Sequence, residues 1–96
     1  MSGNDEVARI FGENLKRYRE LADVSQEDLS VMASVHRTEI SMLERSIRLP
    51  RIDTLVKIAA SLEVSPDELL EGIHWRPGQV ALGRYRITNS DEQEQG

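Results

Sequence analysis

The residues best suited to binding chemistry are arginines, which lie in two separate stretches of the chain. Residues 36–51 hold four arginines against two glutamates, a balance of +2, and residues 75–88 hold three arginines and no acid, a balance of +3. Residues 63–71 and 89–96 carry only acidic charges, with balances of −4 and −3. Because a partner responds to the local field and not to the sum, both arginine stretches are candidates for contact with an anionic partner.

The chain as a whole is acidic. Its 96 residues include 12 Lys and Arg against 17 Asp and Glu, a net charge of −5, whereas a generic nucleic-acid-binding protein is expected to be basic. Other chemistries have less support. There is no cysteine, His36 and His74 are 38 positions apart, and neither a glycine-rich phosphate loop nor a triad-like histidine is present. We therefore expect no enzyme, no metal site and no cofactor.

The size and hydropathy of the chain predict one cytoplasmic domain. Hydrophobic residues make up 39% of the chain and include only one Phe, one Trp and two Tyr, which predicts a single small aliphatic core. No apolar run approaches the roughly 18 residues that span a bilayer, so we expect no membrane contact. The first ten residues are polar and acidic and do not resemble a signal peptide.

Helical periodicity runs through residues 1–74. Apolar residues recur at steps of three and four along a first helix, namely Val7, Ile10, Phe11, Leu15, Tyr18 and Ala22. Capping boxes with hydrophobic staples around Ser25, His36 and Ser65 predict helix starts at about 26, 37 and 66. Leu55, Ile58, Ala59 and Leu62 mark a further helix. The sequence thus predicts an all-α fold with helices at about 5–22, 26–33, 37–45, 52–62 and 66–71.

The link between the second and third predicted helices is only about three residues long, Ser34 to His36. So short a link cannot lay the two helices antiparallel along their lengths, and a steep crossing describes a helix-turn-helix. The apolar residues expected to hold this corner are Leu29, Ala33, Val35, Ile40 and Leu43.

Residues 9–72 resemble the helix-turn-helix domain of the phage repressor and Cro family, which includes bacterial regulators of the xenobiotic-response-element type. The likeness is carried by LKRYRELADVSQEDLS, SVHRTEISMLER and LPRIDTLVKIAASLEVSPDELL. It implies a five-helix repressor-like DNA-binding domain and a sequence-specific transcriptional regulator of double-stranded DNA. Such a regulator would act as a homodimer on a pseudo-palindromic operator, with half-sites about 10 base pairs apart or a multiple of that.

The resemblance implies that the third helix lies in the major groove and that its base-reading positions are Arg37, Thr38, Ser41 and Met42. Arg37 can form a bidentate bond to O6 and N7 of guanine, and Thr38 can offer a hydroxyl or a methyl group. Met42 has no donor and could contact only a thymine methyl group. The alternative at each position is an exposed helix residue or, for Met42, a side chain that covers the core.

The phosphate contacts implied by the resemblance are Gln26, His36, Arg45, Arg48 and Arg51. Gln26 matches a phosphate clamp at the start of the second helix, where backbone amides also favour an anion. Arg19 and Glu44 match a structural ion pair between the first and third helices. We interpret Glu39 as the third position of a capping box and not as a DNA contact.

Three positions depart from the family pattern. Ser34 and Ser46 stand where glycine is usual, and a non-glycine residue enters the left-handed region only at a cost of about 1 kcal/mol or more. His36 replaces the usual Ser or Thr cap, which weakens the helix start by about 1 kcal/mol. We hypothesise that a protonated His36 donates to a phosphate and tightens DNA binding below about pH 6.5. The alternative is a partly buried neutral ring.

The last 24 residues lie outside the resemblance. Residues 74–78 predict a break and a turn, and residues 80–88 predict an extended segment with Gly83 at a bulge or kink. In that segment Tyr85 and Ile87 face one way, and Arg84 and Arg86 face the other. Because a single strand is not stable alone, it must pack on its own domain or pair with its copy in a second chain.

We expect a homodimer interface formed by Leu69, Leu70, Ile73, Trp75, Tyr85 and Ile87. The alternatives are a monomer whose C-terminal segment wraps over its own core, and an arm on DNA formed by Arg76, Arg84 and Arg86. A second function also remains open, an antitoxin-like or regulatory protein-interaction module with the same fold, whose acidic residues 63–71 could bind a basic protein partner. The clustered arginines around the third helix favour DNA.

The chain is thus expected to divide into four parts. Residues 1–8 form an N-terminal arm, residues 9–73 form the helix-turn-helix DNA-binding domain, and residues 74–88 form a C-terminal extension that could dimerise. Residues 89–96, polar and acidic, are expected to be a disordered tail.

Overall fold

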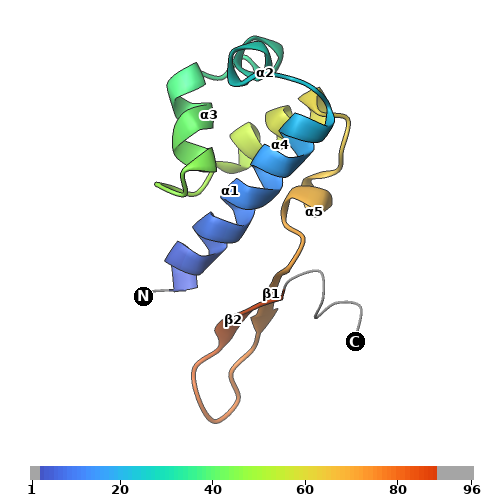
Figure 1. The fold of residues 1–96 in the computed structure, drawn as a ribbon. Helices are drawn as coiled ribbons and strands as arrows, with labels where there is room; N and C mark the ends of the chain where they lie inside the picture. The colour runs from blue at the N-terminus through green and yellow to red at the C-terminus, as the bar shows by residue number, and fades with distance from the viewer. Residues whose placement is uncertain (1–2, 89–96) are drawn as a thin grey trace.

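The computed structural model describes residues 3–88, which form five helices followed by a two-stranded hairpin (Figure 1). The helices are α1 (Gly3–Leu21), α2 (Gln26–Ala33), α3 (Arg37–Glu44), α4 (Ile52–Ser61) and α5 (Pro66–Leu69), and the strands are β1 (Ile73–Arg76) and β2 (Arg84–Ile87). Every predicted helix is present, with ends within about two residues of those expected. The five-helix, all-α fold class with a short extended C-terminus is confirmed.

The core is aliphatic apart from one phenylalanine, as expected. Its fully buried side chains come from all five helices: Phe11, Leu15, Leu29, Ile40, Leu43, Ile58 and Leu69. Most of the predicted stripe on α1 is buried, but Ala22 is exposed because α1 ends at Leu21. α1 is the central element, with α3 on one side and α5 on the other (Figure 1).

Two of the three predicted capping boxes begin with a side-chain cap. The Ser25 hydroxyl accepts from the Asp28 amide at 3.0 Å, and the Ser65 hydroxyl accepts from the Glu68 amide at 3.3 Å. His36 precedes α3 without a side-chain cap bond. α3 starts at the expected residue nevertheless, because burial of Ile40 holds the helix in place.

The C-terminal extension differs from the expectation. Residues 74–76 are not a turn but most of strand β1, which pairs antiparallel with β2 of the same chain. The extended segment covers only Arg84–Ile87, and residues 77–83, Gly83 among them, form the connecting loop in place of a bulged strand. The expectation that Tyr85 and Ile87 share one face of the strand is correct, and on that face they lie opposite Trp75 and Ile73 of β1. The sequence did not predict that this strand pairs with a second strand of its own chain.

The N-terminal residues that the structure describes belong to the helical domain. Residues 3–8 do not form an arm separate from the domain, because they are the first turns of α1 and bury Val7 and Ala8. The predicted disordered tail over residues 89–96 lies outside the described residues, as do residues 1–2.

Candidate nucleic-acid interface

The corner between α2 and α3 is a left-handed turn at Ser34. Ser34 has φ 53° and ψ 45°, and the next amide, that of Val35, donates to the Ser30 carbonyl at 3.0 Å. Ser46 closes α3 in the same way with φ 64°. Serine therefore adopts the conformation usually given to glycine at both places, at the conformational cost expected for a residue with a side chain.

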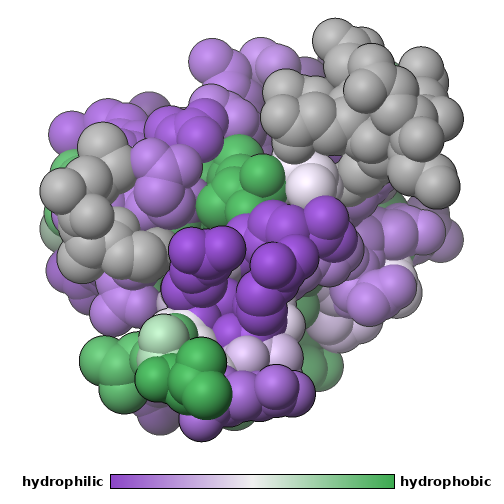
Figure 2. All heavy atoms as spheres, turned by 90° about the horizontal axis from the view of Figure 1, so that it is seen from below, coloured by the Kyte–Doolittle hydropathy of each residue, from purple (hydrophilic) through white to green (hydrophobic). Residues whose placement is uncertain are grey.

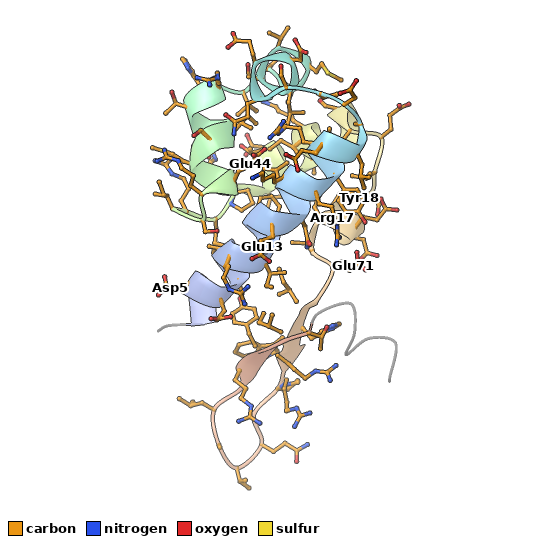
Figure 3. All side chains as sticks on the ribbon, viewed as in Figure 1. Asp5, Glu13, Arg17, Tyr18, Glu44 and Glu71 are labelled. Atoms are coloured by element: carbon orange, nitrogen blue, oxygen red, sulfur yellow. The ribbon has the colours of Figure 1, made fainter. Side chains whose placement is uncertain are left out.

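Glu44 ties the three helices of the site together. Its carboxylate accepts from the Arg19 guanidinium of α1, with Nη2 to Oε1 at 3.0 Å, and from the side-chain amide of Gln26 of α2 at 3.1 Å. The side chains of Arg19 and Glu44 are only 12% and 5% exposed. Figure 3 shows Glu44 pointing from α3 toward α1. The network fixes α3 relative to the start of α2.

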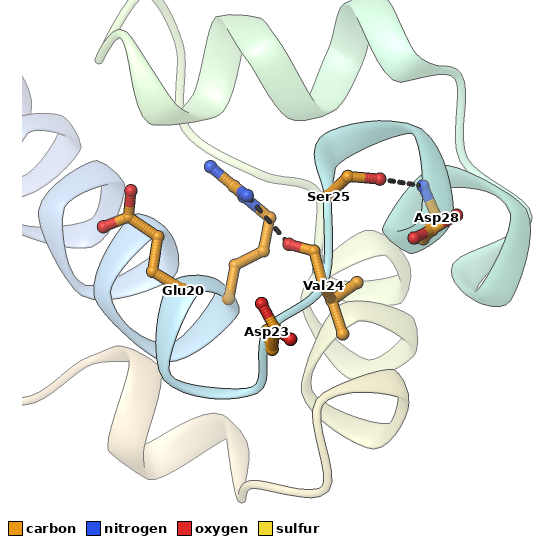
Figure 4. A pocket seen from close by; sticks show the side chains of 6 residues that line it. Glu20, Asp23, Val24, Ser25 and Asp28 are labelled. Carbon is orange, nitrogen blue, oxygen red and sulfur yellow. Dashed lines mark hydrogen bonds between the residues drawn. The ribbon is translucent and has the colours of Figure 1, made fainter.

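Arg19 also anchors the turn that leads into α2. Its Nη1 donates to the Val24 carbonyl at 2.8 Å, beside the Ser25 cap (Figure 4). The hydrogen bonds to Glu44 raise the pKa of Arg19 above its ordinary value, against the opposing effect of burial. The guanidinium is therefore a permanent structural cation, already committed to internal partners.

The predicted base-reading residues lie together along α3. Arg37 and Thr38, in its first turn, are exposed, and Ser41 and Met42 are partly buried. A ligand approaching the N-terminal half of α3 would therefore meet Arg37 and Thr38 first. The arrangement offers a guanidinium, two hydroxyl groups and a thioether on one helix.

Most of the arginines around α3 are paired with carboxylates of the same chain. Arg48 Nη1 lies 3.2 Å from Glu39, Arg51 Nε lies 3.3 Å from Asp53, and Arg37 Nε lies 3.6 Å from Glu27. Exposed pairs of this kind contribute little to stability and can exchange for other anions. Arg45 is exposed and has no ion-pair partner within residues 3–88.

The side chain of Glu39 therefore has a different role from the one expected. The capping box at its helix lacks the side-chain bond from position 36, and the carboxylate of Glu39 pairs with Arg48. His36 is exposed at the start of α3, so the alternative of a partly buried ring is wrong. Its predicted contact with a phosphate stays a prediction, as does the phosphate clamp at Gln26, whose amide nitrogen already donates to Glu44.

Two residues that position the site were not singled out from the sequence. Gly12 lies where α1 crosses the end of α3, and a Cβ atom there would be 2.6 Å from the Leu43 carbonyl oxygen. A lone glycine inside a helical pattern was its only signal. Asn14 is buried and donates to the carbonyls of Leu69 and Glu71 at 3.0 and 2.9 Å, which ties α1 to the end of α5.

The predicted dimer residues divide into two groups. Leu69 is fully buried in the core of its own chain, so it is not available to a partner and that part of the expectation is wrong. The side chains that remain accessible are Leu70, Ile73, Trp75, Tyr85 and Ile87. The hairpin projects from the helices (Figure 1), but Ile73 packs against the core and β2 contacts α1, so the alternative in which the segment wraps over its own core holds only at the base of the hairpin.

Other kinds of site find little support within residues 3–88. No helix in this range is both long and apolar enough to cross a membrane. The same residues contain no group of three or more His, Asp or Glu side chains placed to hold a metal ion.

The chain belongs to the helix-turn-helix family, whose model matches residues 15–69, and its fold is that of the phage repressor-like regulators. The control protein C.SmaI of Serratia marcescens is 35% identical over 65 residues, which are 68% of this chain and 77% of that protein. The restriction-modification controller protein C.AhdI of Aeromonas hydrophila has a TM-score of 0.63 at 29% identity, covering 65% of this chain and 94% of that one. The P22 c2 repressor, solved with a synthetic operator, has a TM-score of 0.61 at 34% identity, with the same coverage.

Proposed function

We propose that the chain is a sequence-specific DNA-binding transcriptional regulator that places α3 in the major groove of double-stranded DNA. The observation that carries the proposal is the first turn of α3, which presents Arg37 and Thr38 to solvent. A major groove about 12 Å wide admits an α-helix, and an arginine at its N-terminal end can read guanine. The similarity to a repressor solved with its operator supports this reading.

The phosphate contacts that we propose come from the loop after α3 and the start of α2. Arg45 is free to meet a phosphate at once, whereas Arg48 and Arg51 must exchange Glu39 and Asp53 for phosphate oxygens. These contacts fix the position of the protein but carry no sequence information. An interface with three arginines can thus bind DNA although the chain has a net charge of −5.

We further propose that the regulator is a cytoplasmic homodimer without catalytic activity of its own. A two-fold symmetric protein reads a pseudo-palindromic operator, with half-sites about 10 base pairs apart or a multiple of that. The accessible residues of the expected dimer surface, such as Leu70 and Trp75, are compatible with such an assembly. A protein-interaction module remains the second candidate, and the test below separates the two.

The test is substitution of one predicted base reader and one predicted phosphate contact. In Arg37→Ala we expect loss of discrimination at a single base pair, about 1–3 kcal/mol. In the control Arg45→Ala we expect all sequences to bind more weakly and the salt slope to fall by about one. Affinities for the preferred duplex and its single-pair variants would be measured by fluorescence anisotropy. Unchanged site preference and affinity in Arg37→Ala would refute the placement of α3.

A further inference from the structure

The hairpin carries a cationic face that finds no counter-charge within residues 3–88. Residues on a strand alternate between faces, and the register pairs Arg76 with Arg84 and His74 with Arg86. These four side chains therefore share one face of the ribbon, opposite the face of Trp75. The three arginines have no ion-pair partner within residues 3–88, and like charges directly opposite each other destabilise a strand pair. This face is therefore complementary in charge to an anionic surface.

A cleft with the complementary charge adjoins the base of this hairpin, and His74 of the cationic face is among its lining residues. It has a volume of about 620 Å³ and is lined by residues at the end of α1, along α5 and at the start of β1. Its carboxylates are Asp67, Glu68 and Glu71. Glu71 bonds Arg17 at 3.2 Å and is close to Tyr18 (Figure 3), whereas Asp67 and Glu68 are exposed and form no ion pair within the described residues.

We propose that two copies of this chain associate reciprocally, with the cationic face of each hairpin seated on the acidic cleft of the other. A two-fold contact requires one patch to meet a second patch and the second to meet the first, and this chain carries both. The contact would relieve the like-charge pairs of the hairpin and neutralise Asp67 and Glu68. The inference rests on the proposed regulator, to which it adds the means of dimerisation.

Two features favour a second copy over DNA as the partner of the hairpin. The acidic cleft lies at α5, on the opposite side of α1 from α3, so the dimer contact leaves the predicted DNA-reading surface free (Figure 1). Figure 2 views the molecule from the end where the hairpin projects, and hydrophilic side chains cover most of the coloured face, with apolar residues only in separate groups. The exposed aromatic side chains Trp75 and Tyr85 lie on the opposite face of the hairpin, so the cationic face itself is open to a charged contact.

The test exchanges the charges of the two patches in separate chains. In Arg84→Glu with Arg86→Glu the hairpin becomes acidic, and in Asp67→Arg with Glu68→Arg the cleft becomes basic. Sedimentation without DNA is expected to show a dimer for the unaltered chain and at least about tenfold weaker association for each altered chain alone. A 1:1 mixture of the two altered chains is expected to form a heterodimer about as tight as the original dimer, since both of its contacts are again attractive.

The design guards against misfolding. Glutamates at 84 and 86 face Arg76 and His74 across the strands, which favours the hairpin, and restoration in the mixture requires both altered chains to be folded. The matched control is Arg45→Glu with Arg51→Glu, an equal change of charge beside α3, which is expected to leave the dimer intact.

Three sedimentation results would overturn the inference: a monomeric unaltered chain, altered chains that each associate normally, or a mixture that does not associate. If the hairpin contacts DNA instead, the chain with Arg84→Glu and Arg86→Glu would bind DNA more weakly, and adding the chain with Asp67→Arg and Glu68→Arg would not restore that binding. This result would also overturn the inference. Because no DNA is needed for the sedimentation, a dimer that selects no DNA site would refute the proposed function and leave this inference standing.

Discussion

Glu44 accepts hydrogen bonds from Arg19 of α1 and from Gln26 of α2, so one carboxylate determines how α3 is presented. In Glu44→Gln the cation of Arg19 keeps its site, with a side chain only 12% exposed, but loses its counter-charge. We expect a loss of about 2–3 kcal/mol in the free energy of unfolding, measured with urea. The apolar pair Arg19→Met with Glu44→Leu should lose less than the two single changes together. Equal, additive losses would show that the two charges are not coupled.

Titration of Arg19 should not change the contribution of the Arg19–Glu44 ion pair to the free energy of unfolding near neutral pH. The pKa of Arg19 is raised in the folded chain, so the stability linked to it is fully present below the ordinary pKa of arginine and is lost only above it. We therefore expect the effect of Arg19→Met on the free energy of unfolding to be the same at pH 7 and pH 9. A clear decrease of that effect at pH 9 would contradict the assignment.

Glu39 restrains one arginine of the interface, Arg48. The carboxylate of Glu39 is a negative charge on the predicted DNA-reading helix, and it forms an ion pair with Arg48. In Glu39→Gln we expect random-sequence DNA to bind about two- to tenfold more tightly and the salt slope to rise by about one, because Arg48 is released. Anisotropy titrations at several salt concentrations measure both. The control Glu13→Gln, which removes an equal charge from an exposed pair with Arg9 on α1, should leave both unchanged.

At the scale of the elements, the helices could be predicted because their signals are local. Ser25 and Ser65 cap the helices that they precede, and apolar spacing gave the buried face of each helix. Strand β1 could not be predicted, because its existence depends on a partner 14 to 8 positions away and the following Pro77 indicated a turn. The contacts of Gln26 and Glu39 were missed for the same reason, since they join residues that only the fold brings together.

Gly12 sets the distance between α1 and the end of α3. In Gly12→Ala the intrinsic helix propensity of α1 improves by about 1 kcal/mol. The new Cβ atom would, however, lie 2.6 Å from the Leu43 carbonyl oxygen, which belongs to the backbone and cannot rotate away. Because overpacking costs about 1–3 kcal/mol, we expect a net loss of thermal stability and weaker, less selective DNA binding. A stabilised variant with unchanged binding would show that the crossing is not tight.

At the scale of the whole molecule, charge is distributed by function. Around α3 the arginines are largely compensated by neighbouring carboxylates, whereas the arginines of the hairpin have no such partner in the part of the chain that the structure describes. The net charge of −5 therefore says little about the partner of any one surface. Because its arginines are paired with carboxylates, the surface around α3 should bind random DNA weakly. Its affinity for a specific site should come mainly from contacts with the bases.

The most direct test of the account is selection of binding sites from a random duplex pool at physiological salt. We expect enrichment of an inverted repeat whose half-sites are about 10 base pairs apart or a multiple of that. Enrichment of a single unrepeated site would retain DNA reading by α3 but contradict the dimer. If no sequence is enriched at physiological or at low salt, the regulator proposed here is wrong and the chain acts through a protein partner.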